Sequence, residues 1–240
     1  MSELFPMSNA LLELAHWAGN HPARLVLGSE GAVAATLPGG LFAVSAAHTS
    51  LARLEAGSLV GFDLAKTQAL LALEDLPPEA LAGARTNPAA PAPSADALAF
   101  ADLFAFDGVH FALHTQPIPI NQIACSPRAR QFTDRRNLPE EILACGQASV
   151  LVPFMPPGLA LAKEIRHRIA LWRDRYKSVP KLILIQNHGM IALGATAAEV
   201  QNVTELAVKY AEIFVGAAML GGPEFLKPNY ITQIESTRLV

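Results

Sequence analysis

A segment at residues 110–116, with the sequence HFALHTQ, combines residue types that can bind a metal ion or move a proton. If this segment is a β-strand, alternate side chains share a face, so that His110, His114 and Gln116 lie on the same side. Imidazoles spaced in this way can present nitrogen atoms to one metal ion. Gln116 is a poor zinc ligand by comparison, because a neutral amide oxygen is a weak donor.

A second candidate, His188, interrupts the apolar run 181–193 within the sequence Asn187-His188-Gly189. Burying a polar side chain costs free energy, so the interruption needs a reason. Gly189 would allow a turn or a close approach of the backbone. Taken singly, either histidine is most simply explained as a hydrogen-bonded core residue, and spacing does not show that His114 and His188 meet.

A carboxylate is also needed beside any metal-activated carbonyl group, because a proton must be moved there. Asp96, in the sequence PSAD at 93–96, is the candidate for this role. It stands at the start of a predicted helix, where Ser94 or Asp96 is equally a good N-terminal cap. Both interpretations of Asp96 stay open at this point.

The elements that must position these residues follow from hydrophobic periodicity and from turn residues. Alternating strands and helices, with an early hairpin and no glycine-rich phosphate loop after a strand, predict an α/β sandwich. The proline-rich stretch 76–93 is interpreted as a surface loop within one domain. Strands are predicted at 24–27, 32–37, 41–45, 59–64, 109–116, 143–152 and within 181–193, and helices at 11–17, 95–104, 159–176 and 196–220.

Composition excludes several classes of protein. The 240 residues are 51% apolar and 16% charged, which is too apolar for a disordered chain, and a net charge of −3 provides no basic field for nucleic acid. No apolar run is long enough for a membrane span, and the N-terminus lacks the basic start of a signal peptide. We therefore expect a cytoplasmic protein with reduced cysteines and no membrane or nucleic-acid partner. The basic positions of the 159–176 helix are interpreted as a solvated face.

Several segments, in order, resemble the class II aldolase/adducin family, and most closely its rhamnulose-phosphate-aldolase-like branch. The resemblance covers nearly the whole chain. It is carried by the segment 93–126 and by ACG at 144–146, VP at 152–153, PGLALA at 157–162, IQNHG at 185–189 and GGPEFL at 221–226.

The resemblance implies one domain over residues 1–240, folded as a three-layer α/β/α sandwich around a mostly antiparallel sheet, and a cyclic homotetramer. It implies a zinc ion, or another divalent cation, held by three histidines, and a small sugar-derived carbonyl substrate that is cleaved through an enediolate. By motif, His114 and His188 are metal ligands, Gln116 takes the place of the second histidine, and Asp96 is the catalytic acid.

The chain departs from the family pattern at the expected substrate contacts. The loop that binds an anionic substrate group falls on Gly31-Ala32-Val33-Ala34, and a serine-glycine pair that assists it falls on Ala47-His48. A histidine four residues after the acid is replaced by Phe100. His110 or His48 could substitute for the missing metal ligand.

The resemblance predicts a carbon–carbon lyase that acts on an unphosphorylated hydroxy-carbonyl compound. A decarboxylase, dehydratase or epimerase using the same enediolate chemistry is a further possibility. The lost polar positions favour, as the alternative, a non-catalytic member that binds a ligand or takes part in an assembly.

Overall fold

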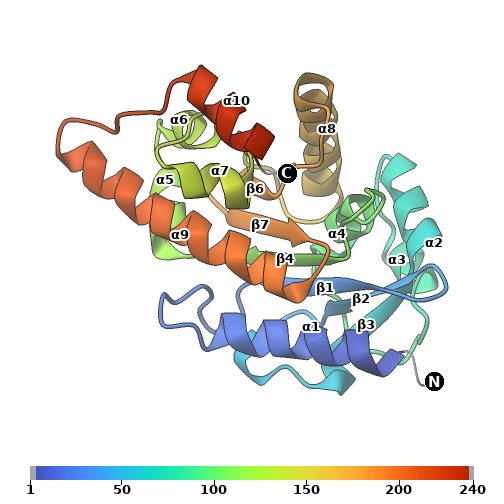
Figure 1. The fold of residues 1–240 in the computed structure, drawn as a ribbon. Coiled ribbons are helices and arrows are strands. Elements are labelled where there is room, and N and C mark those ends of the chain that lie inside the picture. The colour runs from blue at the N-terminus through green and yellow to red at the C-terminus, as the bar shows by residue number, and fades with distance from the viewer. Residues whose placement is uncertain (1–3, 238–240) are drawn as a thin grey trace.

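A seven-stranded sheet forms the centre of the molecule in the computed structural model, which describes residues 4–237 (Figure 1). The strands lie in the order β3-β2-β1-β4-β7-β6-β5, and every neighbouring pair is antiparallel except β5 and β6. The bounds are β1 Ala32–Leu37, β2 Leu41–Ser45, β3 Leu59–Asp63, β4 Phe111–Thr115, β5 Val150–Val152, β6 Leu182–Ile185 and β7 Gly189–Gly194.

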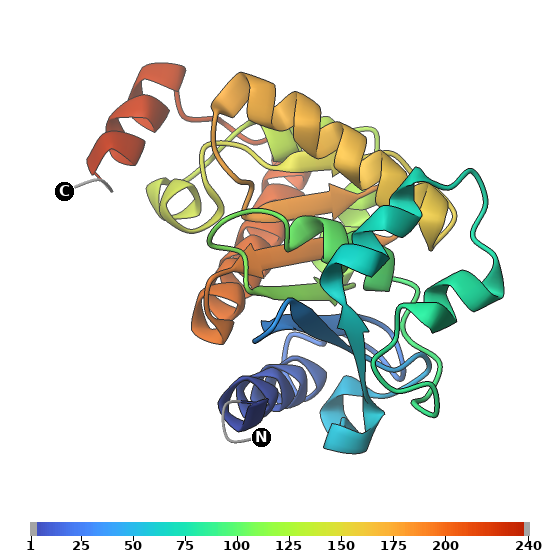
Figure 2. The same ribbon diagram turned by 90° about the vertical axis from the view of Figure 1, so that its right-hand side faces the viewer.

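Helices cover both faces of this sheet. Helices α1, α5, α7 and α9 belong to one apolar cluster, and α4 and α8 belong to a second cluster on the opposite face (Figures 1 and 2). The expected three-layer sandwich around a mostly antiparallel sheet is therefore confirmed. The helices are α1 Leu4–Gly19, α2 Leu64–Ala69, α3 Pro78–Gly83, α4 Ala97–Leu103, α5 Ile118–Ala124, α6 Ala129–Asp134, α7 Pro139–Cys145, α8 Leu159–Tyr176, α9 Ala197–Met219 and α10 Pro228–Thr237.

Strand β4 lies at the middle of the sheet and is buried along its whole length. Its side chains alternate between the layers: Leu113 joins the α9 cluster, whereas Ala112 joins the α4 cluster. By the same alternation His114 faces the α4 layer. The strand thus directs a polar side chain toward the N-terminal end of α4, which begins directly after Asp96.

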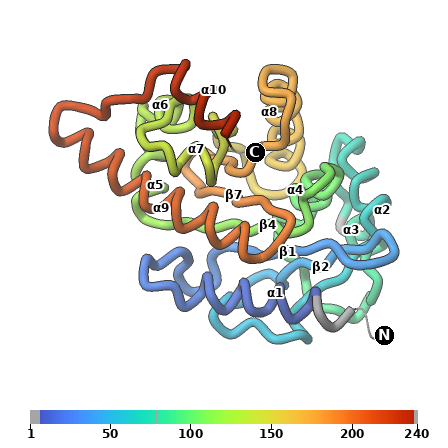
Figure 3. The backbone as a smooth tube through the Cα atoms, viewed as in Figure 1, coloured from blue at the N-terminus to red at the C-terminus, as the bar shows by residue number. Residues whose placement is uncertain are grey.

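The long connection between β3 and α4 contains α2 and α3, so the stretch 76–93, expected to be a surface loop, includes a short helix (Figure 3). Its residues 84–86 bond to β3, through Asp63 N–H to the Ala84 carbonyl and Thr86 N–H to the Gly61 carbonyl. Further along, the Ser94 N–H donates to the carbonyl of Ser45 at the end of β2. These bonds fix the segment that carries Asp96.

Two predicted strands are wrong. Residues 24–27 form no strand, although the Leu25 carbonyl accepts the Gln116 N–H at the end of β4. The apolar run 143–152 divides into the end of α7, a turn at Gly146 and only three residues of β5. An apolar run alone does not distinguish a buried helix end from a buried strand. None of the helices within 4–237 is both long and apolar enough to cross a membrane.

Candidate functional site

Asp96 and His114 form a buried pair at the centre of the candidate site. The His114 ring donates through Nδ1 to Asp96 Oδ2 at 2.9 Å, and the Ser94 hydroxyl donates to the same oxygen at 3.2 Å. His114 is 2% exposed and Asp96 8%. The opposite ring nitrogen of His114, Nε2, is buried without a hydrogen-bond partner among the described residues.

Asp96 occupies the N-cap position of α4, but its side chain makes no capping hydrogen bond. The capping interpretation of Asp96 is therefore wrong. The Asp96 backbone N–H donates a hydrogen bond to Ser94 Oγ. This bond helps direct the Asp96 carboxylate toward β4 instead of back onto the helix. The local sequence Ser94-Ala95-Asp96 thus positions a carboxylate for a partner that is distant in the sequence.

His188 reaches the same place from the turn between β6 and β7. Its ring centroid lies 4.9 Å from that of His114, so the two histidines that spacing could not connect do meet. The tight turn uses a left-handed backbone at Asn187, where φ is 54°. A Cβ atom on Gly189 would lie 2.4 Å from the Thr115 carbonyl and 3.2 Å from His114 Nε2, so only glycine permits this approach of the turn to β4.

Gln116 also borders this space. A Cβ atom on Gly189 would also lie 3.0 Å from Gln116 Cγ, so the Gln116 side chain and His114 Nε2 both border Gly189 in the turn. The structure therefore brings together all three residues expected to bind metal. Even so, residues 4–237 contain no group of three or more His, Cys, Asp or Glu side chains placed to hold a metal ion.

The electrostatics of the cluster follow from burial and from its one close ion pair. Burial alone would raise the pKa of Asp96, but the adjacent His114 imidazole outweighs this and holds that pKa below its usual value. Burial would likewise lower the pKa of His114, yet the Asp96 carboxylate raises it above 6.5, with a smaller contribution from Glu30. The pKa of His188 is lowered by burial and by the neighbouring charge of His114.

The residues expected at the substrate loop lie beside this cluster. Ala32 pairs directly with His114 across β1 and β4, and a Cβ atom on Gly31 would lie 2.6 Å from the His114 carbonyl. Ala47 bonds through its N–H to the Ala92 carbonyl, at the start of the segment that leads to Asp96. These positions surround the cluster but provide no side-chain hydrogen-bond donors.

His110 is not placed to replace a metal ligand. It is exposed, precedes β4, and contacts Thr36 Oγ1 through Nδ1 at 3.2 Å. It lies four positions before His114, a distance of about 13 Å in an extended chain. His48 is exposed in a left-handed conformation, with no hydrogen bond to the cluster among the described residues. Phe100 is fully buried in the apolar core around α4.

Glu30 is a site residue that sequence reasoning missed. Its carboxylate accepts the Leu27 N–H at 3.0 Å and also acts electrostatically on His114. Its position next to Gly31, at the expected anion loop, was the available signal.

Solved structures with a similar fold come from several proteins. A protein described as L-fuculose 1-phosphate aldolase is 14% identical, with a TM-score of 0.75 over 98% of this chain and 97% of the other. YgbL from Klebsiella pneumoniae, described as a putative aldolase/epimerase/decarboxylase, is 17% identical, with a TM-score of 0.71 over 95% and 97%. The N-terminal class II aldolase domain of a Thermoplasma acidophilum protein is 21% identical, with a TM-score of 0.66 over 86% and 92%. At these identities the likeness shows the fold alone.

No curated protein sequence matches this chain. The sequence does match the family model described as the class II aldolase and adducin N-terminal domain, over residues 10–215. That range includes the Asp96 segment, β4 and the β6–β7 turn. The match does not specify a branch, so the likeness to the rhamnulose-phosphate aldolases stays a prediction. The chain belongs to the class II aldolase and adducin family.

Proposed function

We propose that this protein is a carbon–carbon lyase of the class II aldolase type, which cleaves a small, unphosphorylated hydroxy-carbonyl compound. The observation that supports this most is the buried Asp96–His114 pair, whose free His114 Nε2 faces the turn that carries His188. An unpartnered nitrogen in a buried site is costly unless a ligand completes it. Family membership supports an aldolase-like reaction.

The donors present fit a divalent cation held by two histidines. A metal-binding histidine characteristically donates its other ring nitrogen to a carboxylate, as His114 donates to Asp96. His188 would supply the second imidazole and Gln116 a weaker oxygen. The cation would be held less tightly than by three histidines, and when bound it would polarise the substrate carbonyl.

The protein side chains would perform the remaining steps. Asp96 fixes the tautomer of His114, so that the Nε2 lone pair points into the site. As the carboxylate at this position, Asp96 would accept the proton of the substrate hydroxyl as the carbon–carbon bond breaks, and the Ser94 hydroxyl keeps it oriented. The proton would then return to the carbon atom of the enediolate.

The neighbouring surface favours a neutral substrate. A phosphorylated substrate needs charge-assisted hydrogen bonds, each worth roughly 1.5–3 kcal/mol. Gly31, Ala32 and Ala47 offer no side-chain donors for them, and the Glu30 carboxylate would repel an anion. We therefore assign the site to an uncharged ketose or a related compound.

The alternative is a non-catalytic member of the family that binds a ligand or a partner. It is favoured by the apolar replacements at Ala32 and Phe100, both fully buried, and by the missing third metal ligand. In that case the Asp96–His114 pair would be a stabilising core contact.

A cleavage assay separates these functions. The metal-loaded protein would be incubated with a panel of unphosphorylated ketoses, and released aldehyde would be measured by a coupled reduction. Cleavage that falls at least about 100-fold in Asp96→Asn, and not in the exposed control Asp107→Asn, supports the lyase. No cleavage across the panel, or equal cleavage by the folded Asp96→Asn variant, would favour the non-catalytic function.

A further inference from the structure

Three adjoining cavities lie between α6 and α8, outside the candidate site. They measure about 390, 270 and 370 Å³. Arg130 lines all three, while Leu151 of β5 lines two of them. The shared residues join the cavities into one groove, which we call the arginine groove. Its size is that of a small-molecule site.

The arginine groove concentrates positive charge in a chain whose net charge is −3. The charged residues that line it are four arginines and one aspartate: Arg130, Arg135, Arg168, Arg175 and Asp134. Two of the arginines have an acidic partner, since Arg130 lies 3.8 Å from Asp134 and Arg168 lies 2.6 Å from Glu164. Within residues 4–237, Arg135 and Arg175 form no ion pair and instead lie over the rings of Phe225 and Tyr176.

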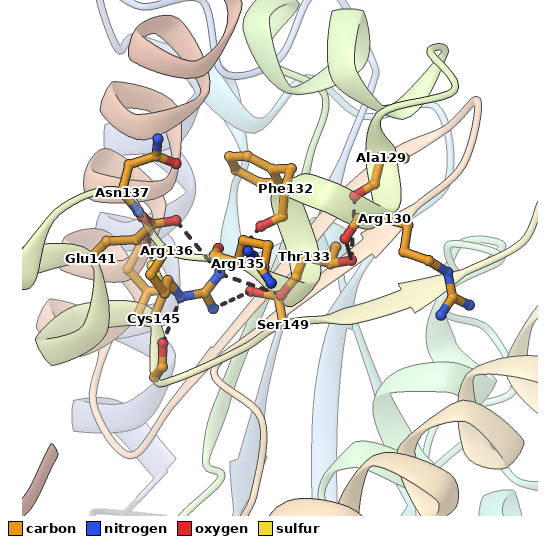
Figure 4. Close-up of polar contacts among 12 residues, drawn as sticks. Ala129, Arg130, Phe132, Thr133, Arg135, Arg136, Asn137, Glu141, Cys145 and Ser149 are labelled. Atoms are coloured by element: carbon orange, nitrogen blue, oxygen red, sulfur yellow. Dashed lines mark hydrogen bonds and ion pairs between the residues drawn. The ribbon is translucent and has the colours of Figure 1, made fainter. Parts of the chain in front are cut away.

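The wall formed by α6 is held rigidly by Arg136, which is 1% exposed (Figure 4). Its guanidinium donates to the Gly146 carbonyl at 2.7 Å and to Ser149 Oγ at 2.9 Å, and it faces the Glu141 carboxylate at 3.5 Å. These bonds tie the end of α6 to the start of β5. Figure 4 also shows the Arg130 side chain extending away from this network.

The opposite wall belongs to α8, whose basic positions are mostly exposed, as expected for a solvated face, while Arg168 is half-buried. Arg168, Trp172 and Arg175 line the groove, whereas Arg173 faces a different part of the surface and lies over the Phe106 ring. β5 forms the floor, and it has no strand on its outer side among the described residues. Gln186, two residues before His188, also lines the groove.

We propose that the arginine groove binds a small molecule that carries two or more phosphoryl groups. The planar guanidinium matches phosphate geometry in paired hydrogen bonds, and several such forks around a confined space favour a multiply charged ligand. The ring of Trp172 offers an apolar surface for the rest of the molecule. None of the residues that line the groove belongs to the proposed lyase site.

Calorimetric titration with pyrophosphate tests the proposal. We expect saturable binding of one pyrophosphate per chain, with a Kd below about 1 mM. Monophosphate should bind at least about tenfold more weakly, because it engages fewer guanidinium forks. The double variant Arg130→Gln/Arg168→Gln should lose at least about tenfold in affinity, and thermal unfolding would verify its fold.

The matched control is Arg53→Gln/Arg173→Gln, which removes the same charge from exposed positions outside the groove. Equal weakening in this control would overturn the proposal, because binding would then follow net charge alone. Absence of saturable binding, or equal affinity for monophosphate, would also overturn it. Tighter binding of a ten-residue polyglutamate peptide than of pyrophosphate would reassign the groove to an acidic protein segment.

Discussion

Restoring a histidine at position 116 should strengthen metal binding. Gln116 directly follows the last residue of β4 and lies two positions beyond His114, about 6.6 Å further along an extended chain. The Gln116 side chain already borders the part of the Gly189 turn that faces His114 Nε2. An imidazole in the Gln116→His variant would therefore reach an ion held by His114 and His188, with a Zn–N bond near 2.0–2.1 Å.

The size of the effect can be bounded. Changes to groups that merely support a metal ligand alter affinity by about 10–100-fold. A direct imidazole ligand in place of a neutral amide should therefore increase zinc affinity at least about 100-fold, or about 2.7 kcal/mol. The gain should also appear as a higher melting temperature in the presence of zinc, because the ion binds only the folded state.

Competition with a chromophoric chelator at pH 7.5 would measure the two zinc affinities. Gln233→His, at an exposed position on α10, is the control for simply adding a histidine. If Gln116→His binds zinc no more tightly than the unmodified protein while remaining folded, His114 and His188 do not share an ion. The same gain in Gln233→His would refute the reasoning equally.

Three further outcomes test the packing and electrostatics. In metal-free protein, the free energy of unfolding should decrease as pH rises from 6.5 through the raised pKa of His114, because the folded state holds that proton more tightly. The lowered pKa of His188 changes stability only below 6.5. In urea titrations, the Asp96→Asn variant should lose this dependence of stability on pH. Gly189→Ala should cost about 1–3 kcal/mol in the same assay, because its Cβ meets the Thr115 carbonyl, while Gly57→Ala, with nothing within 4 Å, should not. Arg136→Met should cost about 3–5 kcal/mol, since it leaves Glu141 buried without its partner, and a loss below about 1 kcal/mol would contradict the role given to this network.

Local patterns predicted those elements whose periodicity is unambiguous. The hairpin at 32–45 and the helix at 159–176 appear with the expected bounds. The helix predicted at 196–220 is α9, and its N-cap Thr196 accepts the Glu199 N–H at 3.1 Å. Each of these depends on residues close in sequence, where side-chain spacing determines the structure directly.

The arrangement of the site could not be predicted in the same way, because it depends on contacts between residues that are distant in the sequence. His114 and His188 are far apart in the chain and meet only because β4 and β7 are neighbours in the sheet. Asp96 has the sequence signature of a helix cap, yet a buried imidazole is the stronger partner for its carboxylate. Likewise, the charge of Arg168 could be assigned to a groove only once α6 and β5 were placed beside α8.

The central claim is that the Asp96–His114–His188 cluster supports enediolate chemistry. Proton NMR of dihydroxyacetone in deuterium oxide measures this most directly, because exchange of its carbon-bound hydrogens requires the enediolate. We expect exchange catalysed by the metal-loaded protein, reduced at least about 100-fold in His188→Ala and unchanged in His110→Ala, whose side chain lies outside the cluster. Exchange that survives in the folded His188→Ala variant, or its absence from the metal-loaded protein, would contradict the account.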